Sequence, residues 1–228
     1  MQESTARTDI DDESTEKVAS PETLSVWGLA WPSILANILY ASVGVVALKA
    51  VGNLGTDAVA AVGTGGRIFF VIQSIMMAIS TGTTALVARA YGARRYQEAS
   101  QVLYDSIVIS IFLIFISIFV IWVAGEDLMS LFGLEAEAKD LAVDYLKVLI
   151  LFAPAFGVSI VQGAAIRAAG DVKTPLYIGL IQNIINIFFL IGFVNGQFGF
   201  PELGVVGAAY AGGISFAIGA ILGLSLIH

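Results

Sequence analysis

The sequence predicts an all-α integral membrane protein built as a bundle of six transmembrane helices. Of the 228 residues, 57% are hydrophobic and only 13% are charged, a composition far from that of an ordinary soluble domain. The mean hydropathy is +0.88. Six windows each hold about 20 mostly apolar residues, which is the length a helix needs to cross the hydrocarbon core. The lipid bilayer is therefore the expected solvent for most of this chain.

The first two windows each contain one residue that is unusual in a membrane helix. The first window spans about residues 24–50 and contains Pro32, whose missing N–H makes it a candidate bending point. The second window spans about residues 58–88 and contains Arg67. Both windows are long enough to cross the bilayer once.

The remaining four windows follow after short connections rich in Gly, Pro and charged residues. Residues 106–125 read SIVISIFLIFISIFVIWVAG, without a single charge. The fourth window lies around residues 147–166 and contains Pro154, the second candidate bending point, although a static kink is an equal alternative. The fifth and sixth windows lie around residues 176–194 and 203–227.

Charge indicates how the chain is divided and oriented. Residues 1–23 are interpreted as a disordered acidic cytosolic tail, and residues 24–228 as the six-helix transmembrane lobe. With the amino terminus in the cytosol, the cytosolic connections receive most of the basic residues, which are Arg89, Arg94, Arg95, Arg167 and Lys173. The positive-inside rule thus predicts a multi-pass protein of the cell membrane, plasma or inner, with a cytosolic amino terminus.

Several classes of function are excluded by what the sequence lacks. There is no cysteine, and His228 is the only histidine, so thiol chemistry, a histidine metal site and a Ser-His-Asp arrangement are not expected. No G-x-S-x-G or phosphate-binding loop is present. Outside the tail the charges nearly balance, so no basic face is available for nucleic acid. We expect no catalytic residues, no metal, no cofactor and no nucleic-acid partner.

Arg67 is the most prominent polar residue inside a window. It lies about ten residues into the second window, hence about 15 Å deep at 1.5 Å per residue. A guanidinium cannot lose its proton, so at this depth it is expected to face the bundle interior or a water-filled cavity and to have a function. The alternatives are that the helix begins later than expected, or that Arg67 reaches the outer headgroups.

Uncharged polar residues within the windows are the other candidates for the substrate or ion pathway. Asn183 and Asn186 are three residues apart and share one helix face. Such residues can bind a substrate, but contacts between helices are their usual role. The candidates are Asn37, Tyr40, Gln73, Gln162, Asn183 and Asn186, with Ser74 and Gln182 beside them.

Several motifs occur in a characteristic order. They are VGNLGTDAVAAVG at residues 51–63, TALVARAYGARRYQEA at residues 84–99, and RAAGDVKTPLYIGLIQNIINI at residues 167–187, followed by FGFPELGVVGAAYA. In order and spacing they resemble the multidrug and toxic compound extrusion (MATE) family over roughly residues 24–225.

The resemblance implies an antiporter that exports small, drug-like organic substrates against an inward H⁺ or Na⁺ gradient. Members usually have twelve helices in two lobes, so this chain is expected to be the amino-terminal lobe, or a fragment, and to need a carboxyl-terminal lobe as partner beside membrane lipid. The family often carries acidic residues at two positions that are here Ala47 and Leu190. A coupling site at these two positions is therefore not expected.

Two other functions stay open. One is a flippase for lipid-linked oligosaccharides of the same wider superfamily, in which more cationic residues than Arg67 alone would line the cavity. The other is a membrane-embedded assembly subunit that transports nothing, which a bundle with few polar interior residues also permits.

Overall fold

The computed structural model describes residues 26–227, and all of its regular structure is helical. The described residues contain no strand, so the all-α prediction is confirmed. The elements are α1 (Val26–Gly52), α2 (Thr56–Gly92), α3 (Tyr96–Ser130), α4 (Ala136–Leu151), α5 (Ala153–Ala168), α6 (Lys173–Asn195), the short 3₁₀ helix η1 (Gln197–Gly199) and α7 (Gly204–Ile227).

The six predicted windows correspond to six helical segments. Within the described residues, α2, α3, α6 and α7 are each long and apolar enough to cross a membrane, and the bent pair α4–α5 counts as a fifth span. The described apolar part of α1 runs from Asn37 to Gly52. The tail predicted for residues 1–23 lies outside the described residues.

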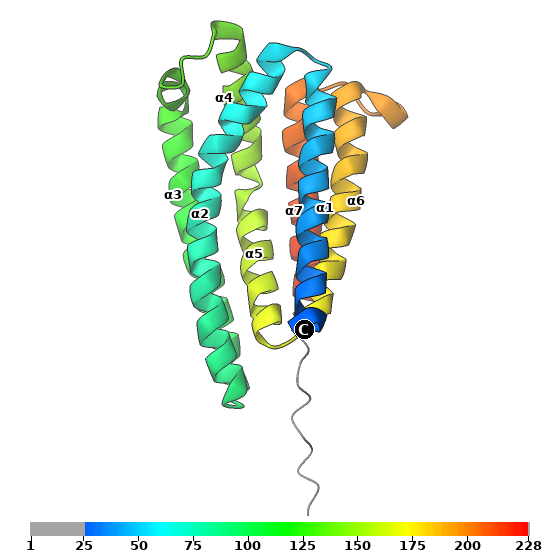
Figure 1. Cartoon of the computed structure of the whole chain (residues 1–228). Coiled ribbons are helices and arrows are strands. Elements are labelled where there is room, and N and C mark those ends of the chain that lie inside the picture. Colours follow the sequence, from blue (N-terminus) through cyan, green and yellow to red (C-terminus); the bar gives the residue numbers. More distant parts are fainter. Residues whose placement is uncertain (1–25, 228) are drawn as a thin grey trace, which may run out of the picture.

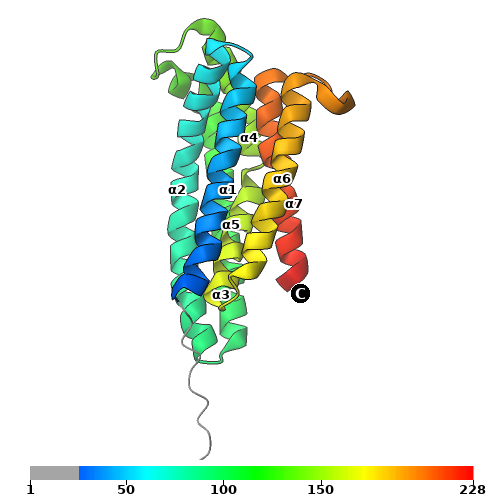
Figure 2. The ribbon, with the colours of Figure 1, turned by 45° about the vertical axis from the view of Figure 1, so that its right-hand side comes forward.

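The helices stand side by side, and their order in space differs from their order in the chain (Figure 1). In the view of Figure 1, α2 and α3 lie at one side, α1, α6 and α7 at the other, and α4 and α5 between them. In the rotated view of Figure 2, α1 lies between α2 and α6 and passes in front of α4 and α5. α2 packs against α3, α4 and α5, and α6 packs along α7. The largest apolar cluster joins α2, α3, α4 and α5 through residues such as Met76, Ile114, Leu146 and Phe156.

The fourth span is broken into two helices rather than continuous. The axes of α4 and α5 differ by 51°, and the break lies at Phe152. Pro154 lies in the first turn of α5, where its missing N–H costs no helical hydrogen bond. The Phe152 ring packs onto α7, over Gly213 and 6.1 Å from the Tyr210 ring, measured between ring centroids.

The Gly-Asp-x-x-Thr-Pro sequence ends α5 and begins α6. Gly170 has a φ of +96° and closes α5, with hydrogen bonds from its own N–H to Arg167 and from the Asp171 N–H to Ile166. One carboxylate oxygen of Asp171 then accepts hydrogen bonds of 3.0 Å from the backbone N–H groups of Lys173 and Thr174. This motif therefore sets the angle at which α6 leaves α5.

We expect the Asp171→Ala substitution to lower the free energy of unfolding by about 1 kcal/mol, because α6 loses its capping acceptor. The Thr174 hydroxyl, followed by the backbone N–H groups of Thr174 and Lys173, lowers the pKa of Asp171 below its ordinary value. A lowered pKa means that the cap stabilises the fold above the unfolded pKa and that this contribution is lost as the pH falls through the folded pKa. Thermal unfolding in detergent between pH 7 and pH 3 measures both effects.

The matched control for this prediction is Asp171→Asn, which keeps an oxygen acceptor and removes the charge. It should retain most of the cap at neutral pH and lose the pH dependence that Asp171 contributes. Equal unfolding curves for Asp171→Ala and the unsubstituted chain would show that the cap does not matter.

Candidate functional site

A polar cavity of about 230 Å³ lies between α2, α5, α6 and α7. It lies along α5, and α5 occupies the lower half of the bundle as drawn in Figure 1. Its polar lining comes from three helices, with Gln73 on α2, Ser159, Gln162 and Arg167 on α5, and Gln182 on α6. The apolar part of the lining is formed by Phe156, Ile160, Ile166, Pro175, Ile178 and Phe216.

Gln162 is the most deeply buried polar group of this cavity, with 1% of the residue exposed. Its amide nitrogen donates to the backbone carbonyls of Gly219 and Ala220 on α7, at 3.2 Å each. Its amide oxygen has no hydrogen-bond partner among the described residues. Because an unsatisfied buried acceptor costs about 1–3 kcal/mol, this oxygen is a ready acceptor for the N–H or O–H of a bound molecule.

Gln182 reaches the same cavity from the opposite helix. Its amide nitrogen donates to the Ser159 hydroxyl at 3.2 Å and to the Ser215 carbonyl at 3.4 Å. Two glycines of α7, Gly219 and Gly223, are four residues apart and so share one helix face. A Cβ atom at Gly219 would overlap the Gln182 amide, and one at Gly223 would overlap the Gln162 amide. The glycines therefore make the room in which both amides lie.

The lining contains one charged residue, Arg167. Its guanidinium folds back over Gly163, where a Cβ atom would lie 3.3 Å from one of the guanidinium nitrogens. No carboxylate is among the lining residues. The cavity thus offers amide and hydroxyl groups that both donate and accept, together with a guanidinium that only donates. It can hold a small polar or partly polar organic molecule.

The structure brings some of the predicted pathway residues together and separates others. Gln73 and Gln162 line the cavity. Asn183 and Asn186 are half-buried on α6 and are not among the lining residues. Asn37 lies exposed on α1. Whether any of these five residues contacts a substrate stays a prediction.

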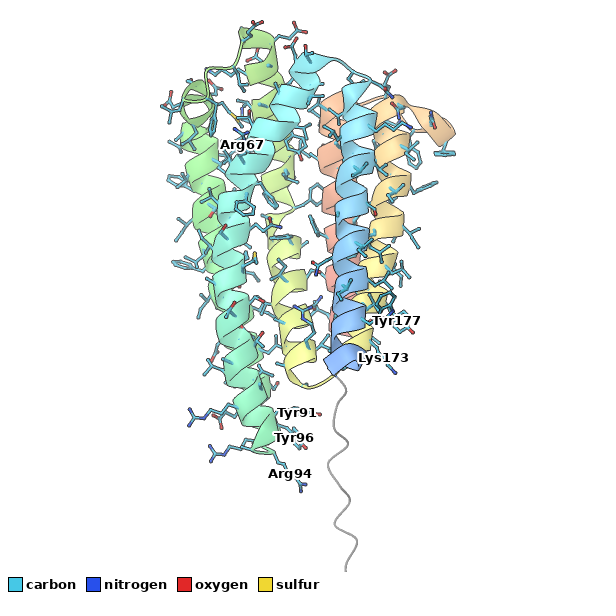
Figure 3. All side chains as sticks on the ribbon, in the orientation of Figure 1. Arg67, Tyr91, Arg94, Tyr96, Lys173 and Tyr177 are labelled. Atoms are coloured by element: carbon cyan, nitrogen blue, oxygen red, sulfur yellow. The ribbon has the colours of Figure 1, made fainter. Side chains whose placement is uncertain are left out.

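Arg67 does not face the interior of the described bundle, and its role in a substrate or ion pathway stays a prediction. Its side chain is exposed and borders a groove between α2 and α3. Arg67 lies in the upper part of α2 as drawn in Figure 3 and is not among the residues that line the polar cavity. The physical reason is that the inner face of this part of α2 is occupied by small and apolar side chains packed against α4. The side chains of Tyr40 and Pro32, the other two predicted residues of the first window, lie outside the described residues.

Ala47 and Leu190 take part in apolar packing between α1, α6 and α7. Leu190 is 1% exposed and belongs to a small cluster with Ala50 and Val194, against which Ala47 packs. An apolar contact therefore occupies the place where the resemblance implies carboxylates.

Two polar lining residues, Ser159 and Arg167, are not among the sequence candidates. Arg167 was assigned to a connection, because charge at the end of a window usually marks its boundary. The spacing of Ser159 and Gln162, three residues apart on one helix face, was the available signal.

The fold and the cavity define the class of this protein, a multi-pass α-helical membrane protein with a polar cavity inside the helix bundle. The model of the MatE family matches residues 32–191. The chain belongs to the MatE family, the multidrug and toxic compound extrusion family.

Relatives and solved structures agree with this assignment. The chain is 33% identical to the "Probable multidrug resistance protein NorM" of Thermotoga maritima, over 84% of this chain and 41% of the relative. It is 31% identical to the "Probable multidrug resistance protein YoeA" of Bacillus subtilis, over 88% of this chain and 44% of the relative. The chain thus spans less than half the length of either relative. Members of the MatE family are transporters rather than enzymes.

Two conformations of one kind of transporter are similar to this fold. The structure "Outward-facing conformation of a multidrug resistance MATE family transporter of the MOP superfamily" superposes with a TM-score of 0.81 at 25% identity, over 87% of this chain and 43% of that one. The inward-facing conformation superposes with a TM-score of 0.76 at 26% identity, over 82% of this chain and 41% of that one. The described helices therefore have the arrangement of one MATE lobe.

Proposed function

We propose that this chain forms one lobe of a secondary active exporter of small organic molecules and works together with a second, carboxyl-terminal lobe. The observation that carries the proposal is the unpartnered Gln162 oxygen in a polar cavity between helices that span the membrane. The multidrug resistance proteins among the relatives support the same function.

The export cycle proposed here uses the cavity as a substrate site that opens in turn to the two sides of the membrane. Gln162 and Gln182 orient the substrate by hydrogen bonds, and Arg167 attracts its electron-rich groups. The gradient of H⁺ or Na⁺ across the plasma membrane drives the cycle. Because the cavity lining holds no carboxylate, we place the coupling group outside this cavity.

Accumulation of a fluorescent drug such as ethidium tests the proposal in cells that express the complete reading frame. We expect lower accumulation than in control cells, restored by a protonophore if H⁺ drives transport and by sodium removal if Na⁺ does. The Gln182→Leu substitution should reduce the efflux rate about fivefold, the equivalent of one lost hydrogen bond. Gln101→Leu makes the same chemical change on the exposed surface of α3 and should leave efflux unchanged. Equal accumulation in expressing and control cells, for every drug tested, would favour the assembly-subunit function.

A further inference from the structure

A second, chemically different hollow lies on the surface between α2 and α3. This groove has a volume of about 490 Å³ and is lined on α2 by residues such as Val71 and Ile75 and on α3 by residues such as Val120 and Leu128. Apart from Arg67 and Ser117, every lining residue is apolar. The groove is thus an apolar slot with one cation at its edge.

The charge of Arg67 is not matched within the part of the chain that the structure describes. Among the described side chains, no carboxylate forms an ion pair with it. Glu126, an acidic residue near the same end of α3, lies 4.0 Å from Lys147 instead. The Ser117 hydroxyl already donates to the Leu113 carbonyl. A cation at the headgroup level attracts anionic groups, so an anion from outside the described residues fits this position.

The groove extends from the headgroup level toward the membrane interior, which is also the direction in which a lipid molecule extends. Arg67 is in the upper part of α2, beside the upper end of α3 (Figure 3). Glu126 and Asp127 at this end of α3 are exposed and acidic, so this end of the helix is expected to lie at the level of the polar headgroups. Ile75 lies about 12 Å further along α2 at 1.5 Å per residue, toward the membrane interior. A negative group at Arg67 and an apolar chain along the groove therefore match one molecule, a phospholipid.

We propose that the α2–α3 groove binds a phospholipid, with its phosphate on the Arg67 guanidinium and one acyl chain between α2 and α3. A planar guanidinium binds phosphate through two parallel hydrogen bonds. The acyl chain packs against the apolar side chains that line the groove. This site is separate from the polar cavity and does not depend on the proposed export function.

Native mass spectrometry of the purified chain, released from micelles that contain defined lipids, tests the proposal. We expect phosphatidylglycerol and phosphatidylcholine to stay bound and diacylglycerol, which has no phosphate, to be lost. Arg67→Gln should lower the retained phospholipid about fivefold, as expected for one basic residue at the membrane surface. Arg89→Gln removes a cation at the other end of α2, away from the groove, and should change nothing.

A second variant tests the groove without touching the cation. Ile75→Trp fills the slot and should also lower phospholipid retention, while circular dichroism shows whether each variant keeps its helix content. Equal retention by Arg67→Gln, Ile75→Trp and the unsubstituted chain would overturn the proposal. So would diacylglycerol binding as strong as phospholipid binding, because the guanidinium would then make no contribution. Displacement of the phospholipid by ethidium would instead assign the groove to an organic cation and would also overturn the proposal.

Discussion

The Gly207→Ala variant should unfold at a clearly lower temperature than the unsubstituted chain, with a loss of about 3 kcal/mol in the free energy of unfolding. The beginning of α7 abuts the end of α6 at this glycine. A Cβ atom on residue 207 would lie 2.6 Å from the carbonyl oxygen of Phe193 and 2.7 Å from its carbonyl carbon. These are backbone atoms of a packed helix, which cannot turn away as a long side chain can.

The same carbonyl also holds the turn that precedes α7. The Leu203 N–H donates to the Phe193 oxygen at 2.7 Å, so a displaced Phe193 would weaken this turn as well. Gly207, three residues after the Phe-Pro-Glu-Leu-Gly sequence, thus makes a contact that only a residue without a side chain allows.

Gly212→Ala is the matched control for this prediction, because it makes the same change in the same helix. The nearest atom to a Cβ at that position is the amide nitrogen of Asn186, 3.9 Å away, an ordinary contact. This variant should be as stable as the unsubstituted chain or slightly more stable, since alanine favours helix more than glycine does. Thermal unfolding in detergent measures both variants, and a loss of equal size in the two would contradict the steric explanation.

The helices were predictable from the sequence because few backbone structures are stable in lipid. A backbone without water must satisfy its hydrogen bonds within helices, so long apolar windows identify the spans. The window around residues 147–166 shows the limit of this argument. Its span begins earlier, at Ala136, because α4 buries apolar residues against α2 and α7 although charged residues lie on its outer face. The span also breaks at Phe152.

The site was only partly predictable, because hydropathy indicates depth and does not indicate which way a side chain points. Arg67 and Gln73 lie six residues apart on α2, so they face different sides of the helix. One borders the surface groove and the other the polar cavity. The cavity itself depends on the crossing of α5, α6 and α7, which brings Gln162 to Gly219 across 57 residues of chain. No local pattern in the sequence contains that contact.

The Gln162→Leu variant should separate stability from function. Leucine fills a similar volume and removes the amide oxygen that has no partner among the described residues. The Gly219 and Ala220 carbonyls lose the Gln162 amide nitrogen, but they lie inside α7 and keep their helical hydrogen bonds, so the free energy of unfolding should rise by about 1 kcal/mol. Efflux of ethidium should fall at the same time, because the substrate loses its acceptor. This combination is expected where a buried polar group is kept for binding and at a cost in stability.

Thr83→Val is the contrasting variant. The Thr83 hydroxyl is also buried, but it is fully used, since it lies 2.8 Å from the Ser106 hydroxyl and donates to the Ile79 carbonyl at 2.9 Å. Its removal leaves Ser106 without this partner and should lower stability by about 1 kcal/mol with no specific effect on efflux. If Gln162→Leu behaved like Thr83→Val, losing stability while efflux per folded molecule stayed constant, Gln162 would be a contact between α5 and α7 only.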